Sequence, residues 1–122
     1  MKILVVEDEP LIRLGLTDVL IEAGYEVSEA AHAAQAIAIL EADPGIHLVL
    51  TDVDMPGDMD GILLAQYVRN RWPPIQLIVV SGKAGIDLDT LPLGSRFIGK
   101  PYPQDQMLEL VRSLFSTEAG TR

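Results

Sequence analysis

The sequence predicts a single α/β domain built on a doubly wound, five-stranded parallel sheet. Short apolar segments alternate with segments of helical periodicity along the whole chain, which is typical of strand-helix-strand units. The central apolar segments have no polar face, as expected for parallel strands that helices cover on both sides. The length of 122 residues fits one such domain.

The first three predicted elements are a strand, a helix and a strand. Residues 3–6 form a compact apolar run that ends at acidic residues and Pro10. Residues 11–23 carry apolar side chains near helical spacing, and Gly24 ends this helix. Residues 25–29 alternate between apolar and polar side chains, which predicts a strand with one less buried face.

The middle of the chain repeats the pattern. Residues 33–42 predict a helix of small and aliphatic residues, which ends at the Asp-Pro-Gly turn of residues 43–45. Residues 47–51 predict a strand around the second apolar run, residues 48–50. Residues 61–71 have helical character, and the two prolines at 73–74 prevent this helix from continuing.

The last third contains two more strands and two helices. Residues 75–80 form the third apolar strand. Residues 86–91 have room for only a turn or two of helix. Residues 96–99 predict a short final strand, and residues 104–115 predict a helix with one apolar face.

The composition excludes several classes of protein. No apolar run approaches the roughly 20 residues that span a bilayer, and the N-terminus does not resemble a secretion signal, so we expect a cytoplasmic protein without membrane association. The absence of cysteine excludes disulfides and thiolate metal sites. A net charge of −9 argues against nucleic-acid binding. We expect the domain to cover residues 1–116 and residues 117–122 to form a frayed tail.

Five side chains that can bind a metal or take part in a reaction lie where predicted strands end: Glu7 and Asp8, Asp52, Ser81, and Lys100. In a parallel doubly wound sheet, ligands bind outside the carboxyl ends of the strands, so we expect these residues at one site. A set of carboxylate oxygens without cysteine suits Mg²⁺. A carboxylate nucleophile can form an aspartyl phosphate, and Mg²⁺, a lysine and a hydroxyl can neutralise the transferring oxygens. The sequence therefore predicts Mg²⁺-dependent phosphorylation of Asp52.

Four segments give the chain a family resemblance, namely residues 3–10, residues 51–56 with the Met-Asp-Gly triplet at 59–61, residues 81–82, and residues 100–101. Over nearly its full length, the chain resembles a receiver domain of the bacterial response-regulator family of two-component signalling. The resemblance implies a flavodoxin-like fold with strand order 2-1-3-4-5. It also implies phosphoryl transfer from a histidine kinase or a histidine phosphotransfer protein, and a downstream protein target.

The resemblance implies a role for each acidic residue. Asp52 matches the phospho-acceptor, and Glu7 and Asp8 match the pair that binds Mg²⁺, with Asp8 as the more direct ligand. The backbone carbonyl of Asp54, together with Asp52 itself, completes the protein's share of the coordination. A separate hypothesis from the sequence pairs the Asp54 side chain with Lys83 across the mouth of the site, where the pair would hinder attacking water.

The remaining matches concern phosphoryl binding and the response to it. Ser81 matches the hydroxyl residue that moves toward the phosphoryl oxygen, and Lys100 matches the lysine that pairs with this group. The resemblance implies a cis bond before Pro101. Phe97 matches the switch aromatic residue that reports phosphorylation through Ser81, with a plain core phenylalanine as the alternative.

The chain departs from the common family pattern in two places. An extra residue near positions 57–58 lengthens the loop beside Asp52 and is expected to affect partner contacts or the lifetime of the phosphoryl group. The segment between Ser81 and Lys100 is short, so we expect a shortened fourth helix.

Two further questions concern the function of the whole protein. Asp52 and Asp54 also resemble the Asp-x-Asp motif of haloacid-dehalogenase-type phosphatases, but no acidic pair follows Lys100 as that family requires. We therefore expect a switch that modifies only itself, not an enzyme with an external substrate. A stand-alone receiver and a receiver fragment of a hybrid kinase or longer regulator remain open alternatives, and dimerisation through the last helix is a further hypothesis.

Overall fold

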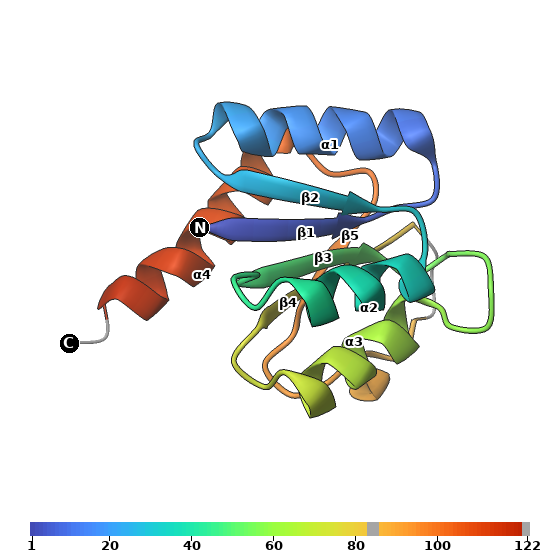
Figure 1. The fold of residues 1–122 in the computed structure, drawn as a ribbon. Helices are drawn as coiled ribbons and strands as arrows, with labels where there is room; N and C mark the ends of the chain where they lie inside the picture. The colour runs from blue at the N-terminus through green and yellow to red at the C-terminus, as the bar shows by residue number, and fades with distance from the viewer. Residues whose placement is uncertain (83–85, 121–122) are drawn as a thin grey trace.

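The computed structural model of the protein describes residues 1–82 and 86–120. Within these residues, five parallel strands form one sheet in the order β2-β1-β3-β4-β5 (Figure 1). The strands are β1 (Lys2–Val6), β2 (Glu26–Ala30), β3 (Leu48–Asp52), β4 (Gln76–Ser81) and β5 (Arg96–Gly99). This order confirms the predicted doubly wound, flavodoxin-like fold class.

In the described part of the chain, four α-helices and one 3₁₀ turn connect the strands. They are α1 (Pro10–Glu22), α2 (Ala33–Ala42), α3 (Gly61–Arg71), η1 (Leu88–Thr90) and α4 (Gln104–Gly120). Pro10 opens α1, where a missing backbone N–H costs no helical hydrogen bond. Side chains cap the next two helices: His32 accepts from the N–H of Gln35 at 3.3 Å, and Asp60 accepts from the N–H of Leu63 at 2.9 Å.

The sheet separates two hydrophobic cores. Helices α2 and α3 pack on one face, where Ala36 and Leu64 are fully buried (Figure 1). Helices α1 and α4 cover the other face through Leu20 and Val111, which are also fully buried. The central strands alternate their side chains between the two cores, which is why they lack a polar face. Among the described residues, every helix is too short or too polar to cross a lipid bilayer.

The segment after β4 holds the shortened fourth helix that the sequence predicted. It is the three-residue 3₁₀ turn η1, which the carboxylate of Asp87 caps by accepting from the N–H of Asp89 at 3.0 Å. Leu91 follows the turn with an extended backbone and precedes Pro92, which disfavours a helical conformation at Leu91, so the turn ends there.

The final helix is longer than its periodicity predicted. α4 continues to Gly120, past the predicted end at residue 115, because no glycine or proline interrupts residues 104–119. Fraying of residues 117–122 stays a prediction, since terminal helical turns open readily.

Candidate phosphorylation and metal site

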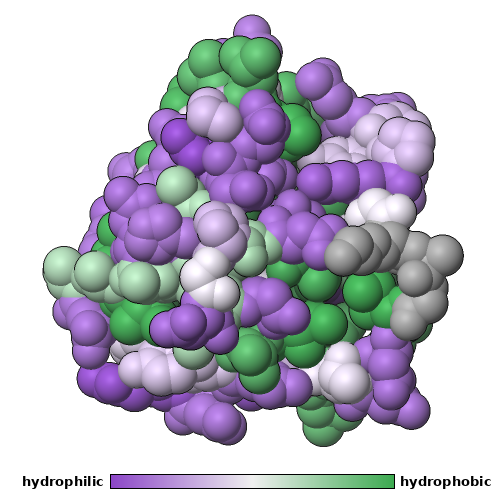
Figure 2. Space-filling model, turned by 90° about the vertical axis from the view of Figure 1, so that its right-hand side faces the viewer, coloured by the Kyte–Doolittle hydropathy of each residue, from purple (hydrophilic) through white to green (hydrophobic). Residues whose placement is uncertain are grey.

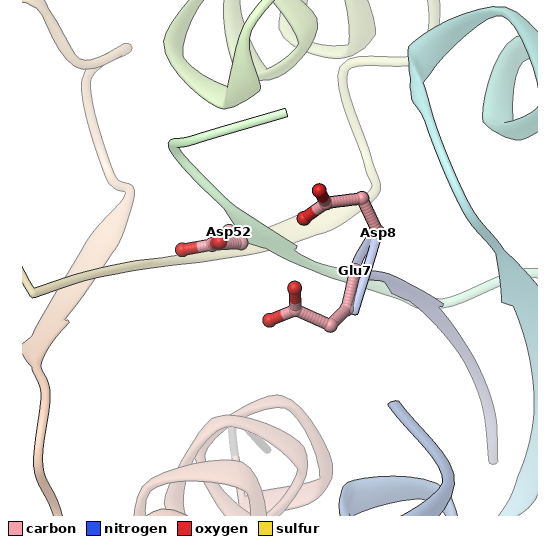
Figure 3. A group of neighbouring side chains, drawn as sticks. All are labelled: Glu7, Asp8 and Asp52. Atoms are coloured by element: carbon pink, nitrogen blue, oxygen red, sulfur yellow. The ribbon is translucent and has the colours of Figure 1, made fainter. Parts of the chain in front are cut away.

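Three carboxylates converge at the edge of the sheet where the strands end (Figure 3). Glu7 and Asp8 follow β1, and Asp52 is the last residue of the neighbouring strand β3. One carboxylate oxygen from each residue lies within 4.8 Å of the other two. Glu7 and Asp52 are buried, whereas Asp8 is exposed to solvent. Figure 2 views the molecule from this edge, where hydrophilic and apolar side chains are interspersed.

Lys100 adds a positive charge to this cluster. Its Nζ lies 3.3 Å from Glu7 Oε1 and 3.3 Å from Asp52 Oδ1. Its backbone N–H donates to the carbonyl of Ser81 at 2.8 Å, which ties the residue after β5 to the end of β4. The structure therefore brings together the residues that the sequence predicted at the ends of β1, β3, β4 and β5.

The pKa values of Glu7, Asp52 and Lys100 are all raised above their ordinary values. Burial raises the pKa of the Glu7 carboxyl, and the charge of Asp52 raises it further. Burial also raises the pKa of the Asp52 carboxyl, although the ammonium of Lys100 opposes this shift. Burial lowers the pKa of Lys100, but the charges of Asp52 and Glu7 together outweigh it and raise the pKa above its ordinary value.

The donor set fits a hard divalent cation. Among the described residues, the buried Asp52 Oδ1 has the ammonium of Lys100 at 3.3 Å as an ion-pair partner but no well-directed hydrogen-bond donor. A buried carboxylate oxygen in this state is costly unless a further cation satisfies it. The available ligands are all oxygens, which suits Mg²⁺ with several retained waters.

The backbone around Asp52 is held from two sides. The buried hydroxyl of Thr51 donates to the carbonyl of Asp52 at 2.9 Å. Gly61, the first residue of α3, donates its N–H to the carbonyl of Val53 at 2.9 Å and packs directly against the carbonyl of Asp52. Thr51 and Gly61 were noted in the sequence only as members of motifs, because nothing in the motifs shows which backbone carbonyls these residues contact.

The backbone of Glu7 is also held on both sides. Its N–H donates to the carbonyl of Ala30 at 3.0 Å, and its carbonyl accepts from Arg13 Nη1 at 2.8 Å. Arg13 Nε also pairs with Glu29 Oε1 at 3.2 Å. The Glu7 side chain turns back to accept from the N–H of Glu9 through Oε2 at 3.1 Å. Arg13 carries no signal in the sequence for this contact, since its spacing from Glu7 matches no motif.

The structure also places the remaining features named from the sequence. Ser81 is buried at the end of β4, and the bond between Lys100 and Pro101 is cis, as the resemblance implies. Phe97 is half-buried and packs against the core beneath α2 and α3. The predicted partner of Asp54, Lys83, lies outside the described residues.

We expect the metal-free protein to be more stable near about pH 5 than near about pH 7. Burial raises the pKa values of Glu7 and Asp52 in the folded state, so on acidification the folded state takes up protons before the unfolded state does. The destabilisation by the buried charges is present above these raised pKa values and disappears as the pH falls through them. Lys100 stays protonated throughout, because its pKa is also raised.

Thermal unfolding in a chelator at the two pH values checks this expectation. The Asp52→Asn variant should show a smaller difference in Tm between the two conditions, because one of the buried titrating groups is gone. An equal or lower Tm of the native protein at the acidic pH would contradict it.

A doubly wound sheet with a carboxylate cluster and a lysine at its carboxyl edge defines the receiver class of phosphorylation-dependent signalling domains. The family model described as the response regulator receiver domain matches residues 3–112. The chain therefore belongs to the response regulator receiver family, whose members act as phosphorylation-based switches in two-component signalling.

Relatives and solved structures agree with this assignment. The chain is 35% identical over 120 residues to the sensor kinase CckA of Brucella abortus (strain 2308), covering 95% of this chain. It is 32% identical over 113 residues to the response regulator protein FleR of Pseudomonas aeruginosa, covering 90% of this chain. The chain spans only 13% of the length of CckA and 24% of FleR. These comparisons give no support to the phosphatase alternative.

Two solved structures superpose over almost the whole domain. The CheY-like response regulator receiver domain protein from Methanospirillum hungatei JF-1 has a TM-score of 0.88 at 28% identity, covering 99% of this chain and 98% of that one. The response regulator protein TrrA from Thermotoga maritima, solved in complex with Mg(2+)-BeF, has a TM-score of 0.81 at 29% identity, with 93% and 97% covered.

Proposed function

We propose that this chain is a Mg²⁺-dependent phospho-acceptor that receives a phosphoryl group on Asp52 from a histidine kinase or a histidine phosphotransfer protein. The observation that carries the proposal is the buried Asp52 Oδ1, which lies 3.3 Å from Lys100 Nζ and lacks a hydrogen-bond donor among the described residues. An oxygen in this state keeps its lone pairs available for attack on phosphorus.

In the proposed reaction, a carboxylate oxygen of Asp52 forms a bond to phosphorus while the bond from phosphorus to the donor's imidazole nitrogen breaks. The electron pair of the broken bond stays on that nitrogen. Lys100 moves from pairing with carboxylates to pairing with the transferred oxygens, and the hydroxyl of Ser81 donates to one of them.

We assign the metal-binding role to Glu7, Asp8, Asp52 and the backbone carbonyl of Asp54. Bound there, Mg²⁺ supplies positive charge that offsets the negative charge on the transferring oxygens. The close approach of three carboxylates to a single ammonium supports this assignment, because the excess negative charge favours binding of a further cation.

The proposed output is a change in partner binding. The phosphoryl group would draw Ser81 and Lys100 toward it, and Phe97 would report that movement to a downstream protein. The protein would turn over no external substrate. The identity of the kinase and target, a homodimer through α4 and the cytoplasmic location stay predictions.

Incubation with acetyl phosphate, followed by intact-mass measurement, tests the proposal. With Mg²⁺ we expect the chain to gain one phosphoryl group, and with EDTA we expect no gain, because the excess charge of the carboxylate cluster then opposes the incoming phosphoryl oxygens. An unchanged mass in the presence of Mg²⁺, or an equal gain in EDTA, would contradict it.

A further inference from the structure

Arg13 joins three parts of the fold at the back of the carboxylate cluster. It lies in the first half of α1, and its side chain is mostly buried. Nη1 donates to the carbonyl of Glu7 at 2.8 Å, while Nε pairs with Glu29 Oε1 at 3.2 Å on β2. The two contacts use two different nitrogens of one planar guanidinium, so they fix both the position and the rotation of this group.

The carbonyl that Arg13 contacts belongs to the peptide unit between Glu7 and Asp8. This unit is planar, so a hydrogen bond that orients the carbonyl also orients the N–H and Cα of Asp8. The N–H of Glu7 donates to the carbonyl of Ala30 at 3.0 Å, so the peptide units on both sides of Glu7 are held. The two acidic side chains leave the backbone on either side of the unit that Arg13 holds.

The fixed peptide plane matters most for Asp8, because packing does little to orient its exposed side chain. Its side chain is exposed, whereas the Glu7 side chain is buried and accepts bonds from Lys100 and from the N–H of Glu9. The direction of the Asp8 carboxylate therefore depends on the backbone more than that of Glu7 does. In Figure 3 both carboxylates point toward Asp52, as a shared cation requires.

We propose that Arg13 is a positioning residue that sets the geometry of the Glu7-Asp8 pair for Mg²⁺ through the carbonyl of Glu7. This inference rests on the proposed function, because it assigns Arg13 a part in the same metal site. Arg13 touches neither the cation nor the phosphoryl group in this proposal. Loss of a group that orients a metal ligand from behind typically weakens metal affinity by about 10- to 100-fold.

The charge of Arg13 and its positioning contact are expected to change Mg²⁺ affinity in opposite directions, which makes the proposal testable. A guanidinium near a cation site repels the cation, so loss of the charge alone would tighten Mg²⁺ binding. Loss of the positioning contact would weaken it. The sign of the change in Mg²⁺ affinity therefore distinguishes the two roles.

Isothermal titration with Mg²⁺ on the full chain measures this sign. We expect Arg13→Met, which keeps an apolar stem but has no donor, to raise the Kd about tenfold or more. Arg13→Lys keeps the charge but can reach only one of the two acceptors, so its Kd should fall between those of Arg13→Met and the native protein. The matched control is Arg71→Met, because Arg71 pairs with Glu41 where α2 and α3 end, at the opposite edge of the sheet (Figure 1).

A second readout excludes a general loss of structure. In the acetyl phosphate reaction, Arg13→Met should need a higher Mg²⁺ concentration for half-maximal rate but should reach nearly the native rate at saturating Mg²⁺. An Arg13→Met protein with native or tighter Mg²⁺ affinity would overturn the inference. If the native chain itself bound no Mg²⁺, the proposed function would fail, independently of any Arg13 variant.

Discussion

Asp52→Asn should take up no phosphoryl group from acetyl phosphate in the presence of Mg²⁺. The asparagine amide has nearly the shape of the carboxylate but lacks its nucleophilic oxygen, so the covalent bond to phosphorus cannot form. The substitution also removes one of the three carboxylates of the cluster, so Mg²⁺ binding should weaken as well. Intact mass checks the first effect, and titration with Mg²⁺ checks the second.

The loss of phosphorylation in Asp52→Asn should not be caused by unfolding of the variant. Because burial raises the pKa of Asp52, a neutral side chain at this position should leave the metal-free fold at least as stable as the native one. The matched control is Asp58→Asn, which changes an exposed carboxylate in the loop after β3 and should leave phosphorylation intact. Uptake of a phosphoryl group by Asp52→Asn at the native rate would place the acceptor elsewhere.

Gly61→Ala should destabilise the protein by roughly 3 kcal/mol or more, at the upper end of what overpacked sites cost. A β-carbon on Gly61 would lie 2.7 Å from the carbonyl carbon of Asp52, 2.8 Å from the Cα of Val53, and closer still to the carbonyl oxygen of Asp52. These neighbours are backbone atoms, so no side chain can rotate away. The start of α3 would have to move from the end of β3, which also carries Asp52.

Urea or thermal unfolding measures the effect, and Gly15→Ala is its control. Gly15 lies exposed inside α1, and no atom lies within 4 Å of the position of an added β-carbon. The same substitution should therefore stabilise the protein there by up to about 1 kcal/mol through helix propensity. Equal effects of the two substitutions would contradict the close approach at Gly61.

Much of the fold and the site follows from local patterns along the chain. The strand that ends at Asp52 was predictable because a buried parallel strand needs an unbroken apolar run, and polar residues mark its end. The clustering of Glu7 and Asp52 was predictable because parallel strands end at a common edge of the sheet. The order of the strands was not in these patterns and came from the family resemblance.

For the segment between β4 and β5, the sequence predicted the length of the helix but not its type. The short segment leaves room over residues 86–91 for only a turn or two, and this does not decide between an α-helical turn and a 3₁₀ turn. The extended backbone of Leu91, which precedes Pro92, ends the helix after one 3₁₀ turn.

By itself, the sequence determined the class of fold and the set of side chains that stand at its carboxyl edge, because apolar runs and the polar residues that end them are local features. Only the tertiary structure decided how those side chains are held. Thr51, Gly61 and Arg13 act through the backbone carbonyls of Asp52 and Glu7. Every residue has such a carbonyl, so residue type and spacing do not show which carbonyl is contacted, and only the packing of the chain decides it.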